Sequence, residues 1–515
     1  PLWMIEGLAE YMSIGRVDAN TSLWMRDAVL NDKVPTLKDL YNPEYFPYRW
    51  GQAFWAFLAG MKGDDIIAPF FVATAKYGFE DACKQVLNMS SKDLSKLWVN
   101  TLKDHYGKYI GDRKERFIGS PLITKKKQGG RLHIAPMLSP NGKYVLFLSE
   151  KDLFSIDIFL ANAVNGKIIR KIHSATKNGH LDDLDFIESA GTWAPDSRRI
   201  AFVAVRKGQN VLVIKDIKGK MLETFEIPGV PAFSNPAWSP DGKSIVVAGL
   251  VNGQVDLYEV FLKNKKVVQL TDDRYSEMAP AWSADGTQLA FATDQLSLER
   301  NTPRLTFNIA VMKLASATRN PLSDGSQGTP KSETTIFDFF FGADNLNPVF
   351  DADGNLLFLS DHDGFRNLYK YEFASGKIFQ LTDFLTGISG ITPYAPAITA
   401  STNGKRNRVF FTHYRDGGYN IYRAKSEQFL HREVAPDSVN LAAATLPKVN
   451  RRATDIVDAN LDAHGTKPTL TEEQMNSLAY RPKFQLDYIG GGAGVGVGFG
   501  QSYGGTATGM AGSVD

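Results

Sequence analysis

The chain is built on a repeated pattern, whose clearest copy is Pro236-Ala-Trp-Ser-Pro-Asp-Gly-Lys243, followed by an apolar run over 244–249. Its Ser-Pro-Asp-Gly core favours a tight turn, because Pro240 presets φ at the second turn position and Gly242 accepts a left-handed backbone. Trp238 precedes the turn and apolar residues follow it. The stretch therefore predicts two strands that meet in a hairpin with a large buried ring at its base.

The pattern occurs six times. The same position of each copy is marked by one apolar or aromatic residue, with 44 to 68 residues between neighbours: Leu138, Trp193, Trp238, Trp282, Phe350 and Ile398. Such a spacing accommodates one four-stranded blade, so the repeat predicts a six-bladed β-propeller. A second repeated element, with copies that end at Gln269-Leu-Thr-Asp272 and Gln380-Leu-Thr-Asp383, predicts the outer hairpin of each blade.

Both halves of the repeat resemble those of TolB-like six-bladed propellers. An all-β sandwich with turns at the same spacing is the alternative. The fold class that we expect is multidomain. It comprises an α-helical segment over 1–112, an all-β propeller over 118–432, a linker over 433–481 and glycine-rich β-strands over 482–515.

Composition narrows the classes of protein to consider. The 515 residues are 43% hydrophobic and 22% charged, as in ordinary globular chains. A net charge of +2 gives no reason to expect a nucleic-acid partner. The single cysteine, Cys83, excludes an internal disulfide. No apolar run is long enough for a transmembrane helix, no secretory signal is visible, and no Gly-x-Ser-x-Gly motif marks a serine hydrolase.

Two stretches of the helical segment resemble gluzincin (peptidase MA-type) metallopeptidases. Trp3-Met-Ile-Glu-Gly-Leu-Ala-Glu-Tyr11 is similar to the helix that supplies the third zinc ligand, and the matching residue is Glu6. Pro47-Tyr-Arg-Trp-Gly51 is similar to the helix start whose tyrosine stabilises the oxyanion, and the matching residue is Tyr48. The resemblance implies zinc as cofactor, Glu6 as a metal ligand and Tyr48 as a catalytic residue. A solvated helix glutamate is the alternative for Glu6.

The zinc-binding histidines of that family are missing. None of the eight histidines begins a His-Glu-x-x-His motif, which the resemblance would place before Pro1. The sequence starts within a helical pattern and stops within a strand pattern, so we expect it to be part of a longer protein. This chain alone is expected neither to hold zinc nor to hydrolyse peptides. A degenerate peptidase domain without activity is the alternative.

The loops before each Pro-x-Trp strand connect the outer strand of one blade to the inner strand of the next. They should therefore line one mouth of the central channel. Several are acidic or aromatic, which suits the binding of a protein or peptide. The candidate partner-binding residues on them are Asp182, Asp185, Tyr275, Glu277, Phe340 and Asp344. Burial between blades is the alternative for Phe339, Phe340 and Phe341.

The end of the chain alternates glycine with apolar residues in Ala493-Gly-Val-Gly-Val-Gly-Phe-Gly500, and a second alternation covers 506–514. Two such strands predict the first hairpin of a membrane β-barrel and resemble the start of a surface-antigen-type outer-membrane barrel. A disordered glycine-rich tail is the alternative.

Taken together, the resemblances imply a bacterial cell-envelope protein of the periplasm or outer membrane, with its signal peptide upstream of this sequence. Its propeller would bind a protein or peptide at the channel mouth, and its helical segment would belong to a zinc metallopeptidase. One alternative is a non-catalytic scaffold that keeps a relic of the peptidase fold. Another is a soluble periplasmic propeller without a barrel.

Overall fold

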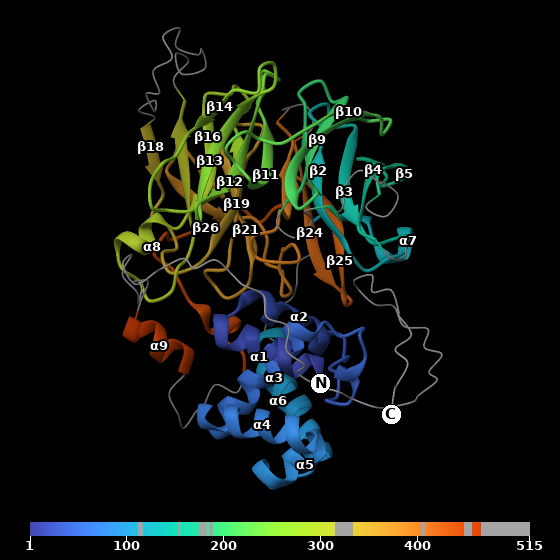
Figure 1. Cartoon of the computed structure of the whole chain (residues 1–515), viewed down its shortest axis with the longest axis vertical. Helices are drawn as coiled ribbons and strands as arrows, with labels where there is room; N and C mark the ends of the chain where they lie inside the picture. Colours follow the sequence, from blue (N-terminus) through green and yellow to red (C-terminus); the bar gives the residue numbers. More distant parts are fainter. Residues whose placement is uncertain are drawn as a thin grey trace, which may run out of the picture. The chain divides into compact units, whose positions relative to one another are not determined.

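The computed structural model describes residues 1–111, 117–152, 155–174, 183–184, 189–314, 333–402, 407–447 and 456–464. All of them belong to one compact unit, Pro1–Thr466. Figure 1 shows a helical segment below a ring of β-sheets, of which the described residues form six. The predicted order, an α-helical segment followed by a six-bladed propeller, is confirmed.

The helical segment packs around large aromatic side chains. Trp3, Phe54, Trp55 and Trp98 are each at most 2% exposed, so their burial is a main source of its stability. The described elements are α1 (Leu2–Ile14), α2 (Ala19–Leu30), η1 (Asp39–Tyr41), α3 (Pro47–Lys62), η2 (Asp64–Ile66), α4 (Ile67–Tyr77), α5 (Phe79–Ala82), η3 (Cys83–Leu87) and α6 (Ser91–Gly111).

Helices α1 and α3 meet at two glycines. A Cβ atom on Gly7 would lie 2.2 Å from the backbone of Gly51, and one on Gly51 would lie 1.9 Å from the carbonyl oxygen of Trp3. Only residues without a side chain let the two backbones approach so closely. The crossing holds the middle of α1 beside the first turn of α3.

Each blade is an antiparallel sheet. The first blade contains β2 (His133–Leu138), β3 (Tyr144–Ser149), β4 (Asp157–Asn162) and β5 (Ile168–His173), and the second contains β6 (Asp183–Leu184), β7 (Thr192–Trp193), β8 (Arg199–Arg206), β9 (Gln209–Asp216) and β10 (Met221–Phe225). The third blade contains β11 (Ala232–Trp238), β12 (Ser244–Val251), β13 (Gln254–Phe261) and β14 (Val267–Gln269). The fourth contains β15 (Glu277–Trp282), β16 (Gln288–Thr293), β17 (Asn308–Lys313) and β18 (Glu333–Ile336). Short helices α7 (Lys125–Gln128) and α8 (Gln295–Glu299) lie outside the sheets.

The last two blades take strands from distant parts of the chain. The fifth consists of β19 (Asn345–Phe350), β20 (Leu356–Ser360), β21 (Asn367–Glu372), β22 (Lys377–Gln380) and the later strand β26 (Arg432–Val434). The sixth consists of β23 (Ile398–Ala400), β24 (Arg408–Arg415), β25 (Gly418–Lys425) and, as its outer strand, β1 (Ser120–Ile123). The antiparallel pairing of β1 with β25 closes the ring between its first and last strands.

The hairpin predicted at the clearest repeat is confirmed. Gly242 has φ 75° and donates its N–H to the carbonyl of Ser239 at 2.9 Å, which closes the turn between β11 and β12. The hydroxyl of Ser239 donates to the carboxylate of Asp241 at 2.7 Å, and this bond within the turn stabilises its conformation. Trp238 is only 5% exposed at the base of the hairpin.

The predicted linker over 433–481 is only partly a linker. Residues 433–447 pack onto the fold through β26 and η7 (Leu441–Ala444), and Leu446 is fully buried among the aromatic side chains of the helical segment. Helix α9 (Ile456–His464) follows.

The glycine-rich strands predicted over 482–515 lie outside the described residues, as do 465–481. Among the helices that the structure describes, none is long and apolar enough to cross a membrane.

Candidate functional site

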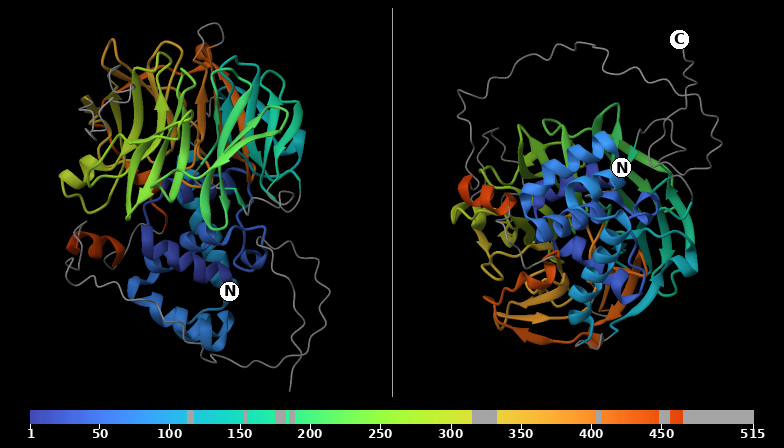
Figure 2. Two further views of the ribbon diagram at one scale, coloured as in Figure 1. Left: turned by 45° about the horizontal axis from the view of Figure 1, so that its top comes forward. Right: turned by 90° about the horizontal axis from the view of Figure 1, so that it is seen from below.

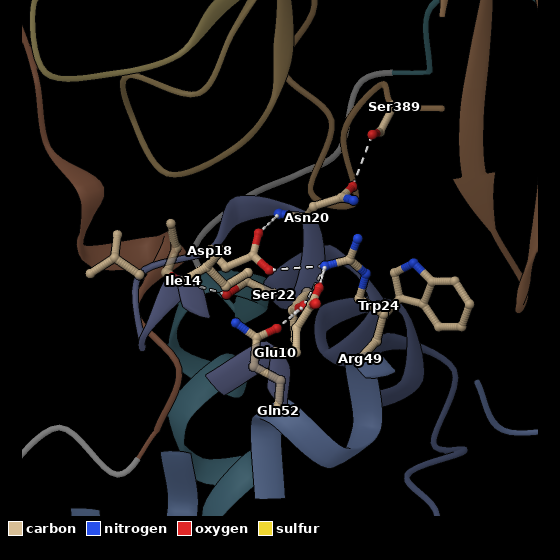
Figure 3. Close-up of polar contacts among 12 residues, drawn as sticks. Glu10, Ile14, Asp18, Asn20, Ser22, Trp24, Arg49, Gln52 and Ser389 are labelled. Carbon is tan, nitrogen blue, oxygen red and sulfur yellow. Dashed lines mark hydrogen bonds and ion pairs between the residues drawn. The ribbon is translucent and has the colours of Figure 1, made fainter. Parts of the chain in front are cut away.

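One mouth of the propeller channel is covered by α2, on the side that the predicted partner-binding loops occupy. Seen from below in Figure 2, the helices lie across the ring. Leu23 of α2 is fully buried and packs with Ile134 of the first inner strand. Asn20 accepts a hydrogen bond from the Ser389 hydroxyl at 2.9 Å and donates to the carbonyl of Ile391 at 3.4 Å, as Figure 3 shows for Ser389. This end is therefore called the covered mouth.

Two charged side chains of α2 join it to the propeller. Arg26, with no exposed surface, donates to the carbonyls of Leu385 at 2.6 Å and Ala443 at 2.7 Å, and its guanidinium lies 4.5 Å from the Phe365 ring centroid. Asp27 accepts the N–H groups of Asp416 and Gly417 at 2.9 and 2.8 Å. Burial raises the pKa of Asp27 although these two backbone donors oppose it.

In a third contact, the charged side chain belongs to the propeller and its acceptors belong to the helical segment. Arg304, on the propeller, donates to the carbonyls of Val17 and Ile14 at 2.8 Å each, at the junction between α1 and α2. Peptide carbonyls are good acceptors for guanidinium groups, and charge-assisted bonds of this kind are stronger than neutral ones. The helical segment and the propeller therefore form one body.

The post-propeller segment strengthens the same junction. Ser22 of α2 donates to the carbonyl of Ala444 at 2.9 Å, and Arg16 donates to that of Leu446 at 3.0 Å. The chain thus returns after the last blade and binds the helices through its backbone. This explains why a stretch with few large apolar side chains is nevertheless ordered.

Two predicted partner-binding residues are buried, which corrects the expectation that they meet a partner. Phe340 has no exposed surface and stacks on His362 with 3.9 Å between ring centroids. Glu277 is 2% exposed and accepts a hydrogen bond from Thr271 at 2.9 Å. Burial, with nearby Asp273 as a smaller cause, raises the pKa of Glu277 to about 8. Both side chains serve the packing of the propeller.

The remaining candidates have local partners or cannot be placed. The half-buried Tyr275 donates its hydroxyl to Glu299 at 3.1 Å. Asp344 accepts the N–H of Phe307 at 3.0 Å, and burial raises its pKa. Asp182 and Asp185 lie outside the described residues.

The opposite end of the channel is hollow and is called here the open mouth. A cavity of about 420 Å³ is formed by the inner strands and by the turns that follow them. Among the described residues, its lining contains no charged side chain. Prolines, aromatic rings, alanines and small polar residues line it, among them Pro136, Thr192, Trp238, Pro280, Ala284 and Phe350.

The walls of this channel are held by hydrogen bonds between neighbouring blades. Asn235 accepts the N–H of Ala279 at 3.2 Å, and Asn347 accepts that of Ala397 at 2.9 Å. The indole N–H of Trp193 donates to the carbonyl of Met137 at 3.0 Å. These bonds satisfy backbone groups at the channel-side edges of the inner strands, so the open mouth is a preformed hollow.

The two residues that resemble gluzincin positions lie together. The hydroxyl of Tyr48, at the start of α3, interacts with the carboxylate of Glu6 on α1, and this interaction raises the pKa of Tyr48. The glycine crossing of the two helices explains why residues 42 positions apart meet.

Sequence reasoning missed the ion pairs behind this contact, which Figure 3 shows. Arg49, 6% exposed, binds Glu10 at 3.0 Å and Asp18 at 3.2 Å. Burial raises the pKa of Glu10 although the Arg49 charge lowers it. Asp18 also caps α2 by accepting the N–H of Asn20 at 2.8 Å. The sequence signal for these ion pairs was Arg49 next to Trp50, because an arginine that is buried beside an aromatic residue requires acidic partners.

Aromatic rings connect this contact to the propeller. Tyr48 and Phe46 have ring centroids 5.2 Å apart, Phe46 and Trp24 5.9 Å, and Trp24 and Tyr414 of β24 4.7 Å. Tyr48 and Phe46 are 36% and 38% exposed, so part of the row faces solvent. The row is a continuous aromatic surface beside Glu6.

The residues present do not by themselves make a zinc site. Within the described part of the chain, no group of three or more His, Cys, Asp or Glu side chains is arranged to hold a metal ion. Glu6 offers one carboxylate, whereas a catalytic zinc site needs three protein ligands.

Comparison with known proteins bears on the propeller. Residues 186–299 match the family described as the TolB beta propeller domain. An uncharacterized protein of Agrobacterium fabrum is 24% identical over 261 residues, which cover 44% of this chain and 84% of that protein. The Tol-Pal system protein TolB of Ruthia magnifica is 30% identical over 83 residues, which cover 16% of this chain and 19% of that protein.

Among solved structures, the crystal structure of TolB from Acinetobacter baumannii matches 67% of this chain and 73% of its own, with 18% identity and a TM-score of 0.34. The family match falls on the second, third and fourth blades. The six-bladed ring and this match together identify the β-rich part of the chain as a TolB-like β-propeller.

Proposed function

We propose that the open mouth of the propeller binds an uncharged, extended segment of a protein or peptide. The observation that carries this proposal is the asymmetry of the channel: α2 covers one mouth, whereas the other keeps a hollow of about 420 Å³. That volume lies in the usual range for ligand sites, and walls that are already formed reduce the ordering cost of binding.

The lining selects the kind of segment. An uncharged lining cannot compensate a buried charge, so lysine or glutamate in the bound segment would be strongly disfavoured. Tryptophan and proline surfaces favour apolar and small residues. A protein partner also agrees with the name of one relative, which assigns that relative to the Tol-Pal system. For this chain we propose a partner within the cell envelope, at the periplasm or outer membrane.

Substitution of Ala284 tests this proposal. Ala284 is exposed, lines the hollow and occupies the turn Ser283-Ala-Asp-Gly286, where a bulky residue is sterically tolerated. Ala284→Trp should weaken binding of uncharged fluorescent nonapeptides at least tenfold by fluorescence anisotropy. Peptides with lysine or glutamate at every third position should bind at least tenfold more weakly than uncharged ones.

Ala352→Trp is the matched control, because Ala352 has the same place in the turn Asp351-Ala-Asp-Gly354 but does not line the hollow. It should bind peptides as the unmodified chain does. Equal binding of charged and uncharged peptides, or equal effects of the two tryptophans, would contradict the proposal.

A second candidate function rests on the contact between Glu6 and Tyr48. We propose that the helical segment contributes these residues to a gluzincin-like metallopeptidase, in which Glu6 is one metal ligand and Tyr48 donates a hydrogen bond to a substrate oxygen. The contact supports this because both residues fall at the family's matching positions and lie together. The two histidine ligands of that family would have to be supplied from outside this sequence, because the residues that the structure does not describe contain a single histidine, His180.

The native protein, purified from its source, provides the test. Stoichiometric zinc by plasma mass spectrometry is expected, with loss of zinc in Glu6→Gln. Tyr48→Phe should keep zinc and lower kcat on a peptide substrate by about 10²–10³-fold, as for other oxyanion donors. Tyr45→Phe is the control, since Tyr45 packs on Trp50 at 5.8 Å and should leave kcat unchanged. Native protein without zinc would instead support a non-catalytic scaffold.

A further inference from the structure

A second hollow lies in the helical segment, remote from both mouths of the propeller. It encloses about 940 Å³ between the 36–41 segment, α5 and α6. Figure 1 shows α5 at the end of the helical segment that is farther from the propeller. This hollow is called here the lysine groove, and its lining includes Leu37, Lys38, Tyr41, Phe79, Lys92 and Lys96.

The inside of the lysine groove is apolar. Leu37 is 2% exposed, and Phe79 packs on Trp3 and Phe70 with 5.7 and 5.8 Å between ring centroids. Tyr41, at 54% exposure, presents much of its ring to solvent. Half-exposed aromatic surface beside buried apolar side chains favours a ligand with a hydrocarbon part.

The groove is held in shape by bonds between its walls. The N–H of Leu37 donates to the Ser95 hydroxyl of α6 at 3.0 Å. The indole N–H of Trp98, also on α6, donates to the carbonyl of Pro35 at 3.0 Å. These two bonds fix the 35–41 segment against α6, so a ligand would not have to order the walls.

The rim is positively charged. Lys38, Lys92 and Lys96 are exposed, and none of them has an ion-pair partner among the described residues. Lys92 and Lys96 are one turn apart on α6, so both ammonium groups lie on the same side of that helix. The one carboxylate of the lining, Glu80, already accepts the N–H of Ser91 at 3.3 Å and pairs with Lys84 at 3.3 Å.

We propose that the lysine groove binds a single-chain anionic amphiphile of the fatty-acid class. The carboxylate would lie at Lys92 and Lys96, where its charge meets two uncompensated cations, and the hydrocarbon chain would cover Tyr41, Phe79 and Val99. The volume of the groove is at the upper end of the range for small-molecule sites. This proposal is independent of the proposed function of the propeller and of the contact between Glu6 and Tyr48.

Isothermal titration of the whole chain with three twelve-carbon probes, each below its micelle concentration, tests the proposal. Dodecanoate should bind at least tenfold more tightly than dodecyl maltoside, and dodecyltrimethylammonium should not bind measurably. Affinity should rise from octanoate to dodecanoate, by at most about fourfold for each methylene that is buried.

Variants identify the site. Lys92→Glu with Lys96→Glu should weaken dodecanoate at least tenfold, whereas Lys218→Glu with Lys220→Glu, an equal charge change on an exposed propeller turn, should have no effect. Tyr41→Ser, at an exposed position, should weaken dodecanoate severalfold while the chain stays folded by circular dichroism.

Three results would overturn the proposal. The first is equal binding of the three probes, which would indicate non-specific apolar adsorption. The second is equal effects of the two charge reversals. The third is binding of a glutamate-rich amphipathic peptide at Lys92 and Lys96 without binding of dodecanoate, which would identify the groove as a site for a protein.

Discussion

Replacement of Arg26 by alanine is expected to lower the free energy of unfolding by about 3–5 kcal/mol. Arg26 has no exposed surface, and its guanidinium serves carbonyls on two separate segments, those of Leu385 and Ala443. Alanine would leave both acceptors without this donor and would create a cavity beside the Phe365 ring. The junction between the helices and the propeller should therefore open first.

Urea unfolding provides the measurement, followed by circular dichroism for the helices and by tryptophan fluorescence for both parts. The two transitions should separate in Arg26→Ala if the junction opens before the propeller unfolds. Arg198→Ala is the matched control, because Arg198 is exposed in a propeller turn and should change stability by less than about 0.5 kcal/mol. A loss below about 1 kcal/mol for Arg26→Ala would show that the carbonyls find other donors.

Addition of one methyl group at Gly51 is expected to destabilise the chain by about 3 kcal/mol or more. The new Cβ atom would lie 1.9 Å from the carbonyl oxygen of Trp3 and 2.6 Å from the Cα atom of Gly7. Both are backbone atoms, so no side-chain rotation can relieve the overlap. Helices α1 and α3 would have to move apart, and the contact between Glu6 and Tyr48 would be lost with them.

Gly107→Ala is the opposite case and serves as the control. Gly107 lies within α6, and no atom is within 4 Å of the place that its Cβ would take. Alanine there should raise stability by about 0.5–1 kcal/mol, because glycine is a poor helix former. Thermal unfolding of both variants measures the two effects. The same sign for both substitutions would contradict the glycine crossing.

The repeat was sufficient to predict the propeller because its signal is local. A turn such as Ser239-Pro-Asp-Gly242 needs a particular backbone at particular positions, so its residues identify the hairpin without knowledge of the rest of the chain. Six copies then imply the ring. The contact between Glu6 and Tyr48 was also accessible, because both positions come from short motifs on adjacent helices.

The covered mouth was not predictable in the same way. The sequence shows that one set of loops lines a mouth, but it does not show which segment of the chain lies against that mouth. Arg26 and Asp27 are the informative residues, since they occupy the buried side of α2 and must have partners there. Their partners are backbone groups of distant segments, which leave no pattern in the sequence.

Phe340 and Glu277 illustrate the same limit. Aromatic and acidic residues in a loop have the composition of a binding surface, yet these two are buried against His362 and Thr271. The backbone of Phe340 has φ 54°, which turns the chain sharply at this loop. Such a turn decides whether a ring faces solvent, and neighbouring residues do not reveal it.

The pairing of β1 with β25 has a consequence for the newly made chain. The outer strand of the last blade is made early, and its partner ends at Lys425, roughly 300 residues later. At about 5–20 residues per second, β1 waits roughly 15–60 s on the ribosome before β25 exists. The contacts of helix α2 with Tyr414 and Asp416 likewise form only after those late residues have been made. During translation both elements lack these partners, so the exposed edge of β1 is open to wrong pairing with other strands until the last blade is made.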